Sequence, residues 1–137
     1  MRKNLIIQIM ELKSICNLDS KITKYCGISP KEAQCLLYIN KQINLTCQNI
    51  AKGLNLSISR CSRIISGLMK KNHLTSNFNL HDRRYHAINL TESGKVMLDK
   101  IQENIKICEK QIKNKLKPSE TAEISRALDK LIAVIQN

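Results

Sequence analysis

The sequence of 137 residues contains no tryptophan, and aromatic residues make up only 3% of it. Proteins that hold single-stranded nucleic acid stack its bases on aromatic side chains, so this scarcity argues against such a platform. The sequence also lacks a long apolar run, a signal-peptide pattern and a lipidation motif. We therefore expect a cytoplasmic protein that makes no membrane contact, with one compact domain or one small domain carrying helical extensions.

Acidic residues are also scarce. Lys and Arg number 23 against 11 Asp and Glu, which gives a formal net charge of +12. The imbalance is uneven, because Asp82 is the only acidic residue between positions 33 and 91. A stretch of this charge favours a polyanionic partner. With so few aromatic residues for base stacking, double-stranded DNA fits better than a single strand.

Motifs of catalysis and metal binding are absent from the sequence. It shows no Ser/His/Asp constellation, no phosphate-binding glycine loop and no paired carboxylates in an apolar setting. The six cysteines form no C-x-x-C motif and no Cys/His cluster at zinc-ligand spacing. His73, His81 and His86 are more readily interpreted as polar wing residues than as metal ligands. We expect no enzymatic activity and no cofactor.

The amino-terminal third of the chain reads as two helices. Apolar residues at three- and four-residue steps, from Leu5 to Cys16, predict an amphipathic helix over residues 4–24. In "SPKEAQCLLYI", Ser29 at the N-cap, Pro30 in the first turn and Glu32 three residues after the serine form a capping box. A second helix is therefore predicted from Pro30 to about Lys41.

Two further helical patterns, separated by a break at residues 53–56, indicate a helix-turn-helix. Thr46 is the N-cap candidate of the first helix and Ser57 that of the second. In the second helix one face is apolar, with Cys61, Ile64, Ile65 and Leu68, whereas the other positions carry Ser59, Arg60, Ser62 and Arg63.

The next segment loses the helical period. "LTSNFNL" at residues 74–80 alternates apolar and polar residues as a half-buried strand does, and "YHAINL" at residues 85–90 is its expected partner. The polar "HDRR" between them predicts a tight connection, so these residues form a β-hairpin wing.

The carboxy-terminal segment is expected to be helical again. Thr91 is a cap candidate for a helix running to about Leu116, and Pro118 precedes a last helix from about Ser119. Apolar residues recur along both helices at near-heptad steps: Met97, Ile101, Ile105, Cys108 and Ile112, then Ile124, Leu128, Leu131 and Ile135. We expect the terminal helices of the chain to pack together.

Candidate DNA-binding residues follow from the helix-turn-helix pattern. Arginines near the start of a recognition helix can bind guanine with two parallel hydrogen bonds, which points to Arg60 and Arg63. Short hydroxyl and amide side chains at both helix starts suit phosphates or bases: Thr46, Gln48, Asn49, Ser57, Ser59 and Ser62. Their alternative role is helix capping and a solvated surface.

The arginines of the expected hairpin tip have a separate candidate role. Arg83 and Arg84 suit the narrow minor groove over A·T-rich sequence. Asp82 would repel phosphate, so we expect it to pair with a neighbouring arginine and order the wing. The alternative is an ordinary solvated turn.

Taken in order, "SPKEAQCLLYI", "TCQNIAKGLNLSISRCSRIISGLMKKNHL" and "DRRYHAINLTESGK" resemble the multiple antibiotic resistance regulator (MarR) family of winged-helix transcription factors. The resemblance spans residues 29–95, and its most specific part is Asp-Arg-Arg followed by Leu-Thr-x-x-Gly. It implies a mainly α-helical fold with a small β-hairpin wing. It further implies a winged helix-turn-helix lobe at residues 29–90, flanked by dimerisation helices at residues 1–28 and 91–137.

The resemblance also carries functional expectations. It implies a recognition helix beginning at Ser57, a wing-tip arginine at Arg84 ordered by Asp82, and a homodimer that binds a pseudo-palindromic operator. Family members commonly repress transcription until a small phenolic or lipophilic molecule binds, which makes a small-molecule inducer a possible partner here. Few aromatic residues are present to line its pocket.

The cysteines leave an alternative input open, because some members of this family sense oxidants through a thiol. Cys16, Cys26 and Cys108 lie in or beside the expected dimerisation helices, where oxidation would change subunit geometry. Cys35 and Cys61 lie on apolar faces and read as core residues. Structural thiols are the favoured interpretation, and a basic architectural or RNA-binding winged helix is the other alternative.

Overall fold

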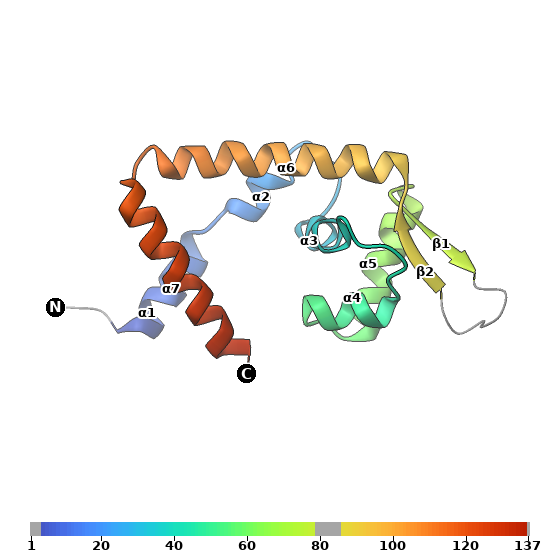
Figure 1. Ribbon diagram of the computed structural model, residues 1–137, viewed down its shortest axis with the longest axis horizontal. Helices are drawn as coiled ribbons and strands as arrows, with labels where there is room; N and C mark the ends of the chain where they lie inside the picture. The colour runs from blue at the N-terminus through green and yellow to red at the C-terminus, as the bar shows by residue number, and fades with distance from the viewer. Residues whose placement is uncertain (1–3, 79–85, 137) are drawn as a thin grey trace. The chain divides into compact units, whose positions relative to one another are not determined.

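The computed structural model describes residues 4–78 and 86–136, and it is mainly α-helical with one two-stranded hairpin (Figure 1). This confirms the predicted fold class. The chain divides into two compact units, residues 1–104 and 105–137. The elements are α1 (Leu5–Ile15), α2 (Leu18–Ile22), α3 (Pro30–Ile39), α4 (Cys47–Leu54), α5 (Ile58–Lys70), β1 (Leu74–Phe78), β2 (His86–Leu90), α6 (Glu92–Lys113) and α7 (Pro118–Gln136).

The single amino-terminal helix expected over residues 4–24 is wrong, since two helices occupy this segment. Asn4 caps α1 by accepting a hydrogen bond from the Ile7 backbone N–H at 2.8 Å. Cys16 then adopts an extended backbone conformation, with φ −73° and ψ 120°, and Asn17 begins α2. Two consecutive residues with non-helical backbone angles interrupt the hydrogen-bond ladder, a break that apolar periodicity does not reveal.

The caps of the three central helices are those predicted. Ser29 and Glu32 form the reciprocal capping box of α3, with a serine Oγ contact to the Glu32 N–H of 3.1 Å. Thr46 caps α4 and Ser57 caps α5. Asn55 ends α4 in the left-handed conformation at φ 56°, which asparagine tolerates better than most residues.

The hydrophobic core of the first unit lies among α3, α4, α5 and the first part of α6. A fully buried leucine or isoleucine side chain in this core contributes about 1.5–3 kcal/mol to the free energy of folding, because its apolar surface is removed from water. The fully buried side chains are Cys35, Leu36, Ile39, Ile50, Cys61, Leu68 and Ile101. Cys35 and Cys61 are thus core residues, as their positions on apolar faces predicted.

The hairpin pairs β1 with β2 in antiparallel register, from Leu74 opposite Leu90 to Phe78 opposite His86. A third segment joins it, because the Ile88 N–H donates to the Leu45 carbonyl at 2.8 Å. This bridge ties the connection between α3 and α4 to the middle of β2. Sequence periodicity did not predict it, because a single bridging residue produces no alternation.

Thr91 joins the wing to α6. Its Oγ1 donates to the Asn72 carbonyl at 2.6 Å and accepts from the Gly94 N–H at 2.9 Å, which confirms it as the helix cap. The Thr91 N–H donates to the His73 carbonyl at 3.2 Å, and the buried His73 ring lies 3.0 Å from the Ser93 hydroxyl. These bonds hold the start of α6 against the residues that lead into β1.

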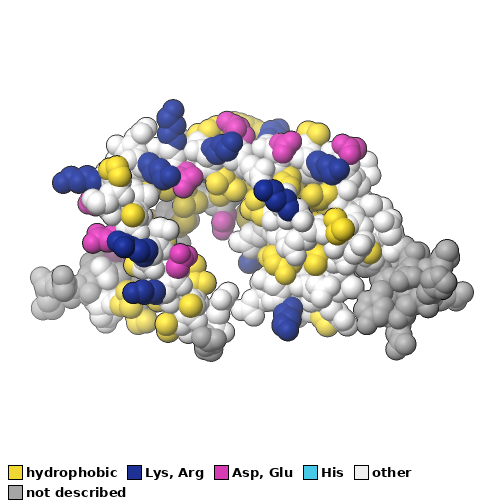
Figure 2. Space-filling model, in the orientation of Figure 1, with side chains coloured by type: hydrophobic (Ala, Val, Ile, Leu, Met, Phe, Trp, Pro, Cys, Tyr) yellow, Lys and Arg dark blue, Asp and Glu magenta, His cyan; other side chains and the backbone are white. Residues whose placement is uncertain are grey.

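The second unit contains the end of α6 and all of α7. The α6 helix ends at Lys113, three residues before the predicted end at Leu116. In α7 no residue is buried, and apolar side chains lie on its exposed surface (Figure 2). Within residues 4–78 and 86–136, no helix is both long enough and apolar enough to span a membrane.

Candidate nucleic-acid interface

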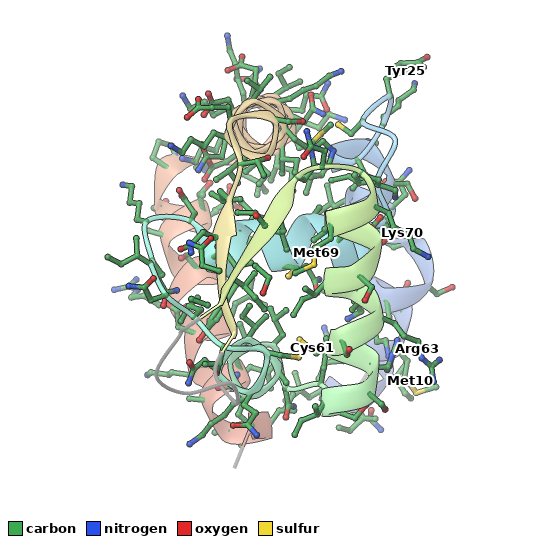
Figure 3. All side chains as sticks on the ribbon, turned by 90° about the vertical axis from the view of Figure 1, so that its right-hand side faces the viewer. Met10, Tyr25, Cys61, Arg63, Met69 and Lys70 are labelled. Carbon is green, nitrogen blue, oxygen red and sulfur yellow. The ribbon has the colours of Figure 1, made fainter. Side chains whose placement is uncertain are left out.

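The α5 helix separates an inner face from an outer one. Cys61, Ile65 and Leu68 are buried, whereas Ser59, Arg60, Ser62 and Arg63 are all exposed. Figure 3 shows the same division, with Cys61 pointing toward α4 and Arg63 pointing away from the lobe. We call these four exposed residues the α5 outer face. Its two guanidinium groups and two hydroxyls can all donate hydrogen bonds to a ligand.

Ser57 lies at the start of this face with its hydroxyl engaged in capping. Its Oγ accepts from the Arg60 N–H at 3.2 Å and lies 3.4 Å from the Ser59 Oγ. The cap fixes the first turn of α5, whose remaining N–H groups and positive dipole end favour an anion such as phosphate. Ser57 therefore supports the interface through helix geometry, and direct contact with DNA stays a prediction.

Thr46 and Asn49 cap α4 reciprocally. The Thr46 N–H and Oγ1 both donate to the Asn49 Oδ1, at 3.0 and 2.8 Å, and the Asn49 N–H donates to the Thr46 Oγ1 at 3.1 Å. These bonds confirm the capping role that the sequence left open for the two residues. Gln48 between them is exposed, and its phosphate contact stays a prediction.

The surface around these residues is electropositive. Neither α4 nor α5 contains an acidic residue, while Lys52, Arg60, Arg63 and Lys70 are exposed on them. In Figure 2 the part formed by α4 and α5 shows dark blue side chains and no magenta ones on the visible face. A surface of one sign attracts a polyanion and raises the rate of encounter.

Sequence reasoning missed two features of this region. Ile58, in the first turn of α5, is 57% exposed, although helical periodicity groups it with Cys61 and Ile65. An exposed apolar side chain at this position suits the methyl group of thymine. The second feature is an ion pair between Glu32 and Lys71.

The Glu32–Lys71 pair fastens the end of the α5 segment to α3. The Lys71 Nζ lies 2.7 Å from the Glu32 Oε1, and the same oxygen accepts from the Ser29 N–H at 2.8 Å. The Glu32 side chain is 9% exposed and that of Lys71 is 40% exposed. Burial raises the pKa of Glu32, but hydrogen bonds from Lys71 and Ser29 outweigh it and hold the pKa below its ordinary value of 4.5. The capping box predicted the Ser29 contact, whereas no local pattern indicated the lysine, 39 residues away.

We predict that this pair makes stability depend on pH. A carboxyl whose pKa is depressed in the folded state stabilises it above the unfolded pKa, and this contribution disappears as pH falls through the folded pKa. Glu32→Gln should lower the free energy of unfolding at pH 7 by about 1 kcal/mol, a value reduced by the solvent exposure of Lys71. The difference should shrink below about pH 4.5.

Urea unfolding of both proteins from pH 7 to pH 3 measures this difference. Glu109→Gln is the matched control, because Glu109 pairs with Lys113 at 3.3 Å with both side chains more than half exposed. It should change stability little at any pH. A difference for Glu32→Gln that stays constant with pH would contradict the assigned role.

The predicted wing residues Asp82, Arg83 and Arg84 lie outside the described residues. Of the cysteines predicted as possible redox sites, Cys16 is exposed, whereas Cys26 and Cys108 are buried. Within the described part of the chain, no group of three His, Cys, Asp or Glu residues is placed to hold a metal ion.

A helix-turn-helix closed by a two-stranded hairpin defines the winged helix-turn-helix class of fold. No protein-family model and no curated protein matches this sequence. Solved structures do match it. The chain is similar to MepR of Staphylococcus aureus in complex with DNA, with a TM-score of 0.82 and 19% identity over 97% of this chain and 99% of that one.

Two other structures agree with this result. MarR of E. coli in its apo form has a TM-score of 0.79 and 17% identity, covering 96% of this chain and 98% of that one. FabT of Streptococcus pneumoniae in complex with DNA has a TM-score of 0.77 and 17% identity, covering 96% and 93%. At these identities the similarity establishes the fold alone, a winged helix-turn-helix like that of these three regulators.

Proposed function

We propose that this protein is a homodimeric, sequence-specific DNA-binding regulator of transcription with no enzymatic activity, acting in the cytoplasm on double-stranded DNA. The α5 outer face is the observation that carries the proposal. It presents Arg60 and Arg63 beside a capped helix start, on a surface without acidic residues. Two of the similar solved structures, MepR and FabT, are complexes with DNA. Recognition helices with this arrangement read base edges in the major groove.

Exposed apolar helices support the dimer. In α1 the large exposed apolar residues are Leu5, Ile6, Ile7, Met10, Leu12 and Ile15, and in α7 they are Ile124, Leu128, Ile132, Val134 and Ile135. Apolar surface on this scale is unusual on a monomer and marks an interaction site. A second copy of the chain is the proposed partner, and two lobes related by a two-fold axis would recognise a pseudo-palindromic operator.

The experiment that tests this function is selection from random duplex DNA with the purified, reduced protein. A dimeric regulator should enrich an inverted repeat whose half-sites are about one helical turn apart. If no motif emerges and all binding disappears in moderate salt, the basic lobe acts as an architectural or RNA-binding surface. A matched selection from random RNA then separates those two roles.

We predict that Arg60→Ala weakens binding to the selected operator by about 1 to 3 kcal/mol and relaxes base preference at one position of each half-site. The loss arises because a bidentate contact to guanine has no replacement. Arg63→Ala should behave alike at a different position. Titration of both variants against operator and random duplexes measures the effect.

Arg126→Ala is the matched control, because it removes an exposed arginine from α7 and should leave affinity unchanged. Equal losses on operator and random DNA for Arg60→Ala would make this arginine a phosphate contact. The proposed base readout would then be wrong at this position.

The proposed mode of regulation is repression of transcription, which binding of a small ligand relieves. Tyr25, which is 85% exposed, and the half-buried Tyr38 are aromatic side chains that can contact a lipophilic molecule. Transcription in vitro from a promoter overlapping the selected operator should fall when the protein is added. Phenolic acids and fatty acids, added in turn, should restore it if the ligand is of this class, and a rise in transcription with protein would contradict repression.

A further inference from the structure

Three cysteines lie near one another among α3, α4 and α5. Cys35 comes from α3, Cys47 is the first residue of α4, and Cys61 lies on the inner face of α5. Cys35 and Cys61 are 0% exposed, whereas Cys47 is partly exposed. The cluster therefore has one thiol that solvent reaches and two that it does not.

Cys47 and Cys61 are in direct contact. The Cys61 Sγ donates a hydrogen bond to the Cys47 carbonyl at 3.7 Å, and the two side chains also interact. Figure 3 shows the Cys61 side chain directed from α5 toward α4. The two residues are 14 positions apart, so they close only a short loop across the turn of the motif.

The chemical state of the buried thiols decides which sulfur reacts first. Burial, with a smaller contribution from neighbouring thiols, raises the pKa of Cys61 and that of Cys35 to about 12. Both groups are therefore protonated at neutral pH, and a thiol reacts with peroxide far more slowly than a thiolate does. Cys47, the partly exposed member, is the sulfur that an oxidant reaches first.

We propose that Cys47 and Cys61 form an oxidisable pair that regulates the candidate DNA interface. Hydrogen peroxide oxidises Cys47: a sulfur–oxygen bond forms, the peroxide O–O bond breaks, and one water leaves. The Cys61 sulfur then attacks the Cys47 sulfur, the sulfur–oxygen bond breaks, and the Cys61 proton leaves with the hydroxyl as a second water. The product is an intrachain disulfide, formed by loss of two electrons and two protons from the thiols.

The effect on DNA binding rests on the function proposed above. Cys47 lies between Thr46 and Gln48, and Cys61 lies between Arg60 and Ser62. A disulfide requires a sulfur–sulfur distance of about 2.05 Å and Cα atoms about 4.4–6.8 Å apart. Its formation replaces the hydrogen bond from the Cys61 Sγ to the Cys47 carbonyl with a sulfur–sulfur bond, and we expect the flanking DNA-binding candidates to be displaced relative to each other. Loss of such geometry in both lobes should weaken operator binding at least about tenfold, equivalent to 1.4 kcal/mol.

Peptide mapping of the full chain tests the bond without DNA. Trypsin separates the three cysteines, since Cys35 falls in residues 32–41, Cys47 in residues 42–52 and Cys61 in residues 61–63. After mild peroxide treatment, non-reducing mass spectrometry should show residues 42–52 joined to residues 61–63. A disulfide from Cys35 to either partner, or no disulfide within the cluster, would overturn the pairing.

A separate experiment tests whether Cys47 is oxidised before Cys61 attacks it. In Cys61→Ala the resolving thiol is absent, so dimedone should label sulfenic acid on Cys47 in that variant. Should Cys61→Ala fail to fold, Cys47→Ser replaces it. This variant alters only a partly exposed side chain and should leave Cys61 unlabelled. Dimedone on Cys61 in the wild type would contradict initial oxidation at Cys47.

The regulatory effect is measured by operator titration before and after oxidation. Wild type should lose affinity and recover it with dithiothreitol, while Cys47→Ser should be insensitive to peroxide. Cys16→Ser is the matched control: it removes an exposed thiol outside the lobe and should respond as wild type does. Equal sensitivity of Cys47→Ser and wild type would overturn the proposal. Absence of operator binding by the reduced protein would instead refute the proposed function, and the peptide map would still decide the thiol pair.

Discussion

Raising the salt concentration from 50 to 200 mM should weaken binding to the selected operator by about 10³- to 10⁵-fold, if the dimer neutralises about 6–10 phosphates. Each phosphate contact releases counterions from DNA, so the logarithm of affinity falls linearly with the logarithm of salt. The net charge of +12 on each chain and the acid-free α4 and α5 are the physical basis of this expectation. Fluorescence anisotropy at a series of salt concentrations measures the slope.

Lys52→Gln tests whether the α4 lysine contributes to the salt dependence of DNA binding. Lys52 is exposed on α4, so its removal should lower the slope by about 1 for each phosphate that is no longer neutralised, and it should weaken binding to all sequences alike. Lys115→Gln is the matched control, because this exposed lysine follows α6 in the second unit and should leave the slope unchanged. A slope near zero for the wild type would contradict an electrostatic interface, and equal effects of both variants would remove its assignment to α4.

Gly94→Ala should lower the free energy of unfolding by about 3 kcal/mol, the upper part of the range for an overpacked site. Gly94 is buried in the first turn of α6, and a Cβ there would overlap the carbonyl oxygen of His73 and lie 3.2 Å from a Leu90 methyl. The carbonyl belongs to the backbone and accepts the Thr91 N–H, so it cannot rotate away. The better helix propensity of alanine recovers only about 1 kcal/mol.

Gly53→Ala is the matched control for this clash. A Cβ at Gly53 would overlap the ring of Tyr38, a half-buried side chain that can turn aside. The helix propensity of alanine then offsets much of the cost, and we expect a change below about 1 kcal/mol. Urea unfolding of both variants measures the contrast. Equal stability of the two would show that α6 shifts freely over the base of the wing.

Gly94 is also the glycine of the Leu-Thr-x-x-Gly motif by which the sequence resembles winged-helix regulators. Leu-Thr-x-x-Gly reads in the sequence as a cap followed by a small residue. In the structure Thr91 bonds to both Asn72 and Gly94, and the glycine permits close approach of α6 to the His73 carbonyl. Local pattern recognised these residues, but the reason for the glycine lies in a chain segment about 20 residues earlier.

Capping residues and apolar periodicity determined most of the helices, because both depend on neighbours three or four positions away. Ser29, Thr46 and Ser57 therefore marked the starts of α3, α4 and α5 correctly. The break at Cys16 was missed, since apolar spacing continues through a residue whose backbone leaves the helix.

What the sequence by itself determined is the fold class, the caps of α3, α4, α5 and α6, and the candidate residues on the α5 outer face, all of which follow from short-range spacing and charge. Only the tertiary structure decided which partner each non-local group meets. It joined Lys71 to Glu32, left Ile58 exposed and placed Cys61 against Cys47. The physical reason is that burial, ion pairing and thiol contact depend on distances between segments far apart in the chain, which spacing along one helix does not specify.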